Sequence, residues 1–216
     1  MISLKGVSKS YKGITIFEDV NITFMPNKWN FIEGVNGSGK SVLLKLICGF
    51  SKPDTGIVTV DDYIIGQDYD FIQNAGICIN SPDFFNNLSG MDNLLEIAKI
   101  KKIVTKNEIY QFCKLFGLEE DINKKYKYYS LGMKQKLGIA NAVMGSPKVV
   151  LLDEPINAID ESGVENVRQI IAKLKENGSI IIVACHDKEE LEFLSNEIYT
   201  IFEGKIVGHR SLKENE

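Results

Sequence analysis

A glycine-rich segment has the residue types and spacing of a loop that binds phosphates. It reads GVNGSGKS and fits the pattern G-x-x-x-x-G-K-S. Its members are Gly34, Val35, Asn36, Gly37, Ser38, Gly39, Lys40 and Ser41. Glycines let neighbouring backbone N–H groups turn toward one anion, and a helix that starts at the end of the loop adds its positive end. We expect Lys40 to reach the terminal phosphates and Ser41 to bind magnesium, so the segment predicts a site for ATP with Mg²⁺.

Two acids follow a strongly apolar run further along the chain. Residues 149–152 are apolar enough for a strand that is buried on both faces, which places Asp153 and Glu154 at its carboxyl end. Ligands of parallel sheets bind at that end. Asp153 is a candidate to hold magnesium through water, and Glu154 is a candidate base for the attacking water. Acids before a proline often only cap a strand, but the phosphate loop upstream favours the catalytic interpretation.

His186 follows another predicted strand, at residues 179–184, and so lies at the same edge of the sheet. A lone histidine is more often structural than catalytic. Its position here favours contact with the γ-phosphate, where it would hold the attacking water in line. Glu154, His186 and Lys40 are therefore the predicted catalytic residues.

The composition narrows the class of protein. The net charge is -4, and Arg168 and Arg210 are the only arginines, so the donors that bind guanines and phosphates bidentately are scarce and no nucleic-acid partner is expected. No apolar run approaches the roughly 20 residues that cross a bilayer, and the N-terminus lacks the apolar core of a signal peptide, which predicts a cytoplasmic location. The four cysteines are scattered singly, without the spacing of zinc or redox sites, and are expected to be buried thiols.

The elements that position these residues follow from hydrophobic periodicity. Strands are predicted at residues 14–24, 28–33, 56–60, 76–80, 149–153 and 179–184. Helices are predicted at 41–49 and 161–176, the second joining two parallel strands, and 197–207 is a predicted hairpin. Residues 91–144 have a polar, helical pattern that is broken at Gly117 and at an aromatic cluster near Tyr128. The chain is thus predicted to be an α/β protein with a helical insertion.

Residues 129–137, YSLGMKQKL, stand shortly before the acidic strand and resemble the signature motif of ATP-binding-cassette (ABC) ATPases. The resemblance covers essentially the whole chain, and the motifs have the family's order and spacing. It implies a single domain over 1–216: a P-loop NTPase core with a mainly parallel sheet, an N-terminal antiparallel β subdomain and an inserted α-helical subdomain. The core would comprise approximately residues 1–85 and 146–216, and the insertion approximately 86–145.

The resemblance also assigns roles. Tyr11 matches the aromatic residue that stacks on adenine, although an exposed turn tyrosine is the alternative. Ser130 and Gly132 match the signature residues that cover the γ-phosphate bound to a second copy, and Asp160 matches the aspartate that communicates between the two sites. Glu154 corresponds to the family's catalytic glutamate and His186 to its switch histidine.

Two segments depart from the family pattern. The signature is commonly L-S-G-G-Q, whereas this chain has Leu131 and Met133 around Gly132, a variant similar to cassettes of bacitracin, lantibiotic and multidrug exporters. We expect both side chains to point away from the nucleotide. Asn80 occupies the position of the metal-binding glutamine and is shorter by about 1.5 Å. Since a misplacement of about 1 Å can cost on the order of a hundredfold in rate, we expect slow basal hydrolysis.

The resemblance implies an ATP-hydrolysing transport subunit. Two copies would close around two ATP molecules and power transport, with export favoured, through a separate membrane permease that holds them at the cytoplasmic face. Residues 79–94 would carry the motion, with Phe84 and Phe85 as contacts to the permease. Packing of these two side chains inside the insertion is the alternative. A non-transport ABC ATPase and a P-loop kinase are the alternatives, which the short chain and the signature motif respectively disfavour.

Overall fold

The fold is built on two sheets, as the computed structural model shows for residues 1–80, 83–101, 105–186 and 196–212. The smaller sheet is antiparallel, and its strands in spatial order are β2 (Ile14–Phe24), β1 (Ile2–Tyr11), β4 (Thr55–Val60) and β5 (Tyr63–Ile64). The larger sheet has the order β10 (Lys205–Ser211), β9 (Glu197–Phe202), β3 (Trp29–Glu33), β8 (Ile180–Cys185), β7 (Val149–Asp153) and β6 (Ala75–Cys78). Its strands are parallel except for β10, which pairs antiparallel with β9. The predicted α/β fold with a mainly parallel sheet and an N-terminal antiparallel sheet is confirmed.

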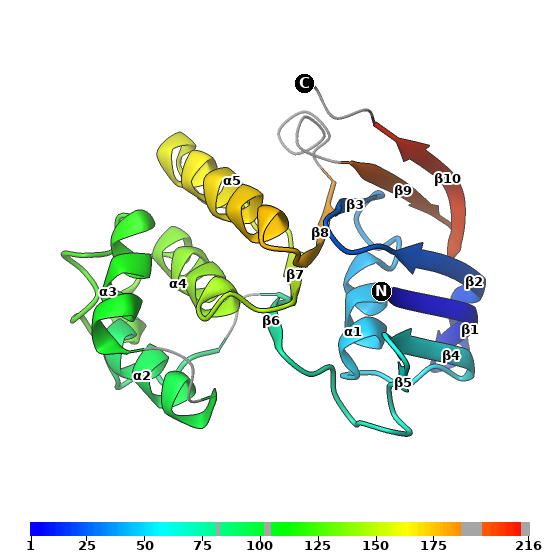
Figure 1. The fold of residues 1–216 in the computed structure, drawn as a ribbon, viewed down its shortest axis with the longest axis horizontal. Helices are drawn as coiled ribbons and strands as arrows, with labels where there is room; N and C mark the ends of the chain where they lie inside the picture. Colours follow the sequence, from blue (N-terminus) through cyan, green and yellow to red (C-terminus); the bar gives the residue numbers. More distant parts are fainter. Residues whose placement is uncertain (81–82, 102–104, 187–195, 213–216) are drawn as a thin grey trace.

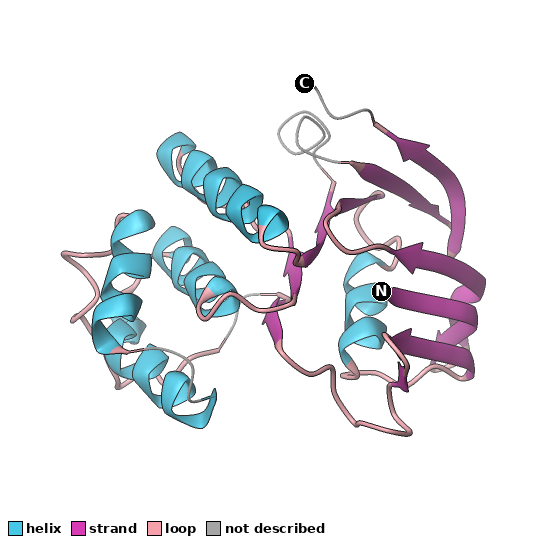
Figure 2. Cartoon of the chain, in the orientation of Figure 1, coloured by secondary structure: helices cyan, strands magenta, loops and turns pink. Residues whose placement is uncertain are grey.

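Helices cover the larger sheet on both faces (Figures 1 and 2). Helix α1 (Lys40–Cys48) lies between the two sheets, and the other face carries the helical region. That region contains α2 (Gly90–Lys101), α3 (Lys106–Leu115), the 3₁₀ turn η1 (Tyr126–Tyr128) and α4 (Leu131–Val143), and it is followed by α5 (Glu161–Glu176). None of the described helices is both long and apolar enough to cross a bilayer.

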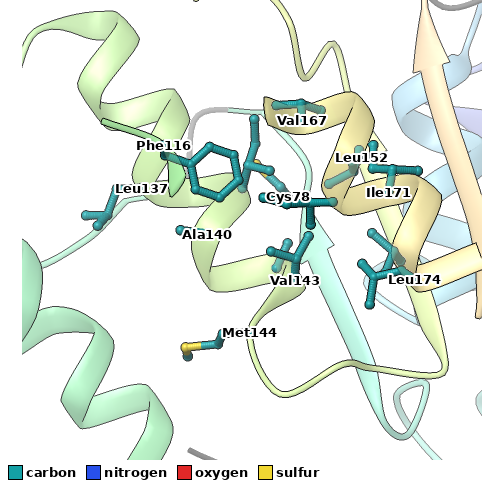
Figure 3. Close-up of a cluster of buried hydrophobic side chains, with 14 of the residues drawn as sticks. Cys78, Phe116, Leu137, Ala140, Val143, Met144, Leu152, Val167, Ile171 and Leu174 are labelled. Atoms are coloured by element: carbon teal, nitrogen blue, oxygen red, sulfur yellow. The ribbon is translucent and has the colours of Figure 1, made fainter. Parts of the chain in front are cut away.

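The continuous apolar sequence of β7 is explained by its two buried faces. Val149 and Leu151 pack into the cluster that contains α1, whereas Val150 and Leu152 pack into the cluster that contains the helical region. Figure 3 shows the second cluster, where Leu152 meets side chains of α4 and α5. Because neither face of this strand meets water, its residues are apolar until the acidic side chains at its carboxyl end.

The sequence-based element bounds are close to those observed, apart from strands that were missed and a helical run that is divided. β2 and α5 have the predicted bounds, and the crossover from β7 through α5 to the parallel strand β8 is confirmed. β1 was not predicted, and the helical run is divided where Thr105 and Glu108 form a capping box at the start of α3. Residues 102–104 of that run lie outside the described residues. All four cysteines are buried and free of disulfides, as expected.

Candidate functional site

The phosphate loop opens onto a cavity of about 490 Å³ at the carboxyl ends of β3, β7 and β6. Residues of the loop, the acidic strand, the signature helix and the segment after Pro155 line it. They are Ile16, Asn36, Gly37, Gly39, Lys40, Ser41, Val42, Asn80, Leu131, Gln135, Asp153, Glu154, Asn157 and Ala158. The structure therefore brings most of the phosphate loop, the three predicted metal ligands and Glu154 to one cavity, at the carboxyl ends of parallel strands where ligands bind. Gly34, Val35, Ser38 and His186 are not part of its wall.

The N-terminus of α1 faces the loop without a side-chain cap. Gly39 occupies the N-cap position with φ 104°, and no side chain among the described residues hydrogen-bonds to the first turn there. In contrast, Ser130 caps α4 and Thr105 caps α3. A side chain at position 39 would be strained at this φ and would meet Phe17, because an added β-carbon would lie 2.8 Å from its ring. The uncapped N–H groups and the helix dipole suit this end of α1 to an anion.

Lys40 is held at the centre of the site by groups that a phosphate would replace. Its Nζ donates to the carbonyl oxygens of Gly34 at 2.8 Å and Val35 at 3.3 Å, and lies 3.5 Å from Glu154 Oε1. The side chain is almost fully buried. A buried ammonium needs a compensating charge, so the lysine favours an anion in the cavity.

The Glu154 carboxylate lies between Lys40 and His186 and contacts both side chains. Its second oxygen, Oε2, lies 2.9 Å from His186 Nδ1, and its backbone N–H donates to the Ala184 carbonyl at 2.7 Å. The backbone bond fixes the residue to the neighbouring strand β8 while φ is 48°, a left-handed conformation that is uncommon outside glycine. The carboxylate is one-fifth exposed and borders the cavity, where a water beside it can be polarised.

The environment of the Asp153 carboxylate is suited to binding a cation. Its Oδ1 is buried, and no donor among the described residues reaches it. Burial raises the pKa of Asp153 above its usual value, against the opposing effects of the Ser41 hydroxyl and Lys40. A divalent ion, or water bound to one, would satisfy this oxygen, and the oxygen donors of Asp153, Ser41 and Asn80 are those that Mg²⁺ prefers.

Asn80 lies at the cavity in a strained conformation. Its φ is 58°, in the left-handed region, and its backbone lies close enough to Asp153 to lower that residue's pKa. Asparagine tolerates this region better than glutamine does, because its short side chain can hydrogen-bond locally. The backbone thus gives a physical reason for asparagine at this position. Residues 81 and 82, which follow it in the predicted moving segment, lie outside the described residues.

Asn80→Gln is expected to raise kcat for basal ATP hydrolysis, by roughly tenfold to a hundredfold, because the longer amide would extend further into the cavity, where Mg²⁺ and the attacking water would be held. The same change should lower the melting temperature slightly, since glutamine is less suited to φ 58°. Asn80→Gly is the matched control, which removes the strain and the amide together and should lower kcat. An unchanged kcat for Asn80→Gln would show that this position does not limit turnover.

Tyr11 is placed outside the cavity wall. It ends β1, is partly exposed, and its hydroxyl lies 2.7 Å from Ser51 Oγ. Ile16 lines the cavity from the same sheet. Stacking of Tyr11 on adenine therefore stays a prediction, and Ile16 is an apolar neighbour of the loop that sequence reasoning did not identify.

The signature segment begins α4 with a cap. Ser130 Oγ accepts a hydrogen bond from the Met133 N–H at 3.2 Å, and Ser130 is exposed. Met133 packs against the hydrophobic core, as expected for a side chain that points away from the nucleotide. Leu131 differs from the expectation, because it is exposed and contributes to the cavity wall. Its position at the exposed start of a helix leaves no core for it to enter.

Polar contacts link the signature helix to the catalytic segment. Gln135 is buried, and its Nε2 donates to the carbonyls of Glu154 at 3.2 Å and Pro155 at 3.3 Å. Lys136 Nζ lies 2.6 Å from Asp160 Oδ1, and this contact, with the Ser162 hydroxyl, lowers the pKa of Asp160 to about 2. Sequence reasoning did not identify Gln135 or Lys136. The signal for Gln135 was a polar residue on the apolar face of a predicted helix.

The fold and this site define a P-loop nucleotide-binding protein, in which a strand, a glycine loop and an uncapped helix meet a buried aspartate and a flanking glutamate. The signature helix beside the cavity narrows the class further.

Comparisons with known proteins agree. The model of the family "ABC transporter" matches residues 17–157. The chain is 32% identical over 220 residues to the bacitracin transport ATP-binding protein BcrA of Enterococcus faecalis, covering 99% of this chain and 70% of that protein. It is 32% identical over 209 residues to the lantibiotic transport ATP-binding protein SrtF of Streptococcus pyogenes, covering 96% and 89%. The dimeric structure of MJ0796, a bacterial ABC transporter cassette, superimposes with a TM-score of 0.89 at 26% identity over the whole of both chains.

The chain belongs to the ABC transporter family, as an ATP-binding subunit with the family's ATPase site.

Proposed function

We propose that two copies of this chain bind two ATP molecules between them, with Mg²⁺, and hydrolyse ATP to drive export through a separate membrane permease. The observation that carries the proposal is the Glu154 carboxylate, which lies between Lys40 at 3.5 Å and His186 at 2.9 Å on the rim of the phosphate cavity. A carboxylate in this position can accept a proton from water that attacks a phosphate held by the loop.

Each residue has a defined task in this proposal. The loop amides and Lys40 bind the phosphates, and Glu154 takes the proton of the attacking water. His186 orients the Glu154 carboxylate and contacts the γ-phosphate. Asp153, Ser41 and Asn80 would hold Mg²⁺, which neutralises phosphate charge when bound. Catalysis then consists mainly of positioning and charge stabilisation, because phosphoryl transfer requires little covalent chemistry from the protein.

The signature residues Ser130 and Gly132, together with Asp160, do not line the cavity of their own chain. Tyr11, Gly34, Val35 and Ser38 are also absent from its wall, although the rest of the phosphate loop belongs to it. The exposed position of Ser130 leaves its side chain accessible to a second copy, and the likeness to a cassette whose solved structure is dimeric supports this use. A two-fold dimer uses the same surface on both chains, so each ATP would receive Lys40 from one copy and Ser130 from the other.

Mixing two inactive variants tests this composite site. Lys40→Ala removes the phosphate lysine, and Ser130→Asp places a negative charge toward the γ-phosphate while keeping a good N-cap for α4. Each variant alone should lose ATPase activity. A mixed dimer holds one intact site, made of Lys40 from the Ser130→Asp chain and Ser130 from the Lys40→Ala chain. An equal mixture should therefore recover activity, up to about a quarter of the wild-type rate if the chains pair at random.

No recovery in the mixture, with both variants folded and the wild type active, would contradict the dimer and favour a site that one chain completes. Circular dichroism of each variant checks that the loss is not caused by unfolding.

Of the two phenylalanines expected to contact the permease, only Phe85 is retained in this proposal. Phe84 packs edge-on against Tyr126, with ring centroids 5.3 Å apart, whereas Phe85 is 70% exposed. The backbone of Phe85 is nevertheless fixed, because the buried Asn93 accepts from its N–H at 2.8 Å and donates to its carbonyl at 3.1 Å. A rigidly held, exposed aromatic residue loses little conformational entropy on binding and suits a contact anchor.

Phe85→Glu is expected to leave the ATPase rate of the purified chain within about twofold of wild type, because surface changes away from a site have small effects. Its binding to washed membranes of the source organism should fall by roughly tenfold or more, because a charge replaces an aromatic side chain that the permease would bury. Ile100→Glu is the control, since Ile100 is 81% exposed on α2. Equal membrane binding by both variants would remove Phe85 from the proposed contact.

A further inference from the structure

Three different metal-ligating side chains meet at the carboxyl ends of β7 and β8. Cys185 is the last residue of β8, His186 follows it, and Glu154 follows the neighbouring strand β7. One ligand atom from each, the Cys185 Sγ, a ring nitrogen of His186 and a carboxylate oxygen of Glu154, lies within 4.8 Å of the other two. Across the part of the chain that the structure describes, this is the one such group of three or more histidine, cysteine or acidic side chains.

We propose that Cys185, His186 and Glu154 form a binding site for a soft divalent cation such as Zn²⁺, and that an ion bound there inhibits ATP hydrolysis. One thiolate, one imidazole and one carboxylate are the ligand types that zinc uses, with a fourth position left for water. Mg²⁺ prefers oxygen ligands alone, so the sulfur separates this site from the oxygen donors around Asp153.

The distances are compatible with one shared ion. Zinc lies about 2.3 Å from sulfur and about 2.0–2.2 Å from nitrogen and oxygen, which places tetrahedral ligand atoms about 3.3–3.8 Å apart. Glu154 Oε2 and His186 Nδ1 are 2.9 Å apart, and the sulfur lies within 4.8 Å of the ligand atoms of both residues. Shifts of about 1 Å or less therefore suffice, and rotation of the partly exposed His186 ring can supply them.

Burial and charge determine how tightly the proposed site should bind the cation. The Cys185 side chain is fully buried, so its thiolate requires a nearby cation. His186 and Glu154 are partly exposed, and Glu154 borders the cavity, which gives an ion access to the site. The Lys40 ammonium opposes a cation, but it faces Oε1, and Oε2 is the oxygen that faces His186. With three protein ligands and this opposing charge, we expect weaker binding than at a four-ligand structural zinc site.

Inhibition follows from the ligands that the ion would occupy. A Glu154 oxygen and a His186 nitrogen bound to zinc are withdrawn from the attacking water, whereas the phosphate loop is untouched. The ion should thus lower kcat without preventing nucleotide binding. This effect on rate rests on the proposed catalytic role of Glu154, but binding of the ion does not. The isolated cysteines in the sequence predicted no such site, because its ligands come from two strands.

Cd²⁺ binding to nucleotide-free protein tests the site directly, because cadmium–thiolate bonds absorb in the ultraviolet. We expect this absorption in wild type and in Cys113→Ser, and its loss in Cys185→Ser. Cys113 is the matched control, since its side chain is equally buried but lies in α3. His186→Ala should weaken the titration without abolishing the absorption. If Cys185→Ser does not fold, Cys185→Ala serves the same purpose.

ATPase assays at saturating MgATP and buffered free Zn²⁺ test the consequence. Wild type and Cys113→Ser should share one inhibition midpoint, and Cys185→Ser should need about tenfold more zinc or higher while keeping its basal rate. Cadmium absorption that is independent of Cys185, or equal zinc inhibition of all three proteins, overturns the proposal. Cysteine-dependent cadmium binding in a chain without ATPase activity would support the metal site and contradict the proposed function instead.

Discussion

Glu154→Gln is expected to lower kcat for ATP hydrolysis by about a hundredfold or more, because the amide cannot accept a proton from the attacking water. Nucleotide binding should persist. Glutamine keeps a similar shape beside His186, and removal of the carboxylate frees Lys40 from its 3.5 Å ion pair with Glu154. The ammonium then has only the loop carbonyls as partners and favours a phosphate.

If the composite site exists, the slow hydrolysis of Glu154→Gln should also change its oligomeric state. When hydrolysis stops, two ATP molecules should hold two chains together, so size-exclusion chromatography with light scattering should show a dimer of Glu154→Gln in ATP and a monomer in ADP. Lys40→Ala is the control, because it should lose hydrolysis and the dimer together. A Glu154→Gln chain that stays monomeric at ATP far above its dissociation constant would count heavily against the composite site.

Gly76→Ala is expected to lower the free energy of unfolding by about 3 kcal/mol or more, the largest effect we predict for a single methyl group. Gly76 lies in β6, where an added β-carbon would be 1.6 Å from the Ala142 carbonyl oxygen and 2.6 Å from its carbon. These are backbone atoms of α4, so the whole helix must move. A drop of about 6–12 °C in melting temperature should follow for a domain of this size.

Gly117→Ala separates this clash from the intrinsic effect of losing a glycine. Gly117 has φ 66° and no atom within 4 Å of an added β-carbon, so only backbone strain of about 1 kcal/mol is expected. Equal melting temperatures for the two variants would show that α4 does not approach β6 as closely as described. Folded Gly76→Ala should also hydrolyse ATP more slowly, because β6 leads to Asn80 and α4 begins at the signature.

The residues of the site were predictable where local sequence determines their position. An apolar strand followed by acids places Asp153 and Glu154, and a strand followed by the glycine loop places Lys40 and Ser41, without knowledge of the rest of the chain. The local sequence did not indicate the spatial order of the strands in the sheet. β3 lies between β8 and β9, which follow it by well over a hundred residues, and no local pattern encodes that pairing.

Two further features depended on tertiary contacts. β1 has interior polar residues, and its pairing with both β2 and β4, through irregular registers, makes it a strand. Gln135 became recognisable as a support of the catalytic segment only when its amide was placed against the Glu154 carbonyl. The capping box of α3, in contrast, was present in the sequence as Thr105 and Glu108, and it marks a helix start that periodicity alone overlooked.

Because β6 is an edge strand of the larger sheet, the backbone that leads to Asn80 is held less firmly than the rest of the site. Glu154 and His186 follow interior strands, each of which is bonded to a neighbour on both sides, so displacing either residue strains two ladders. Asn80 follows β6, which is bonded only to β7 through the pairs from Ala75–Val149 to Cys78–Leu152. We therefore expect a force applied at this edge to displace Asn80 more readily than Glu154 or His186.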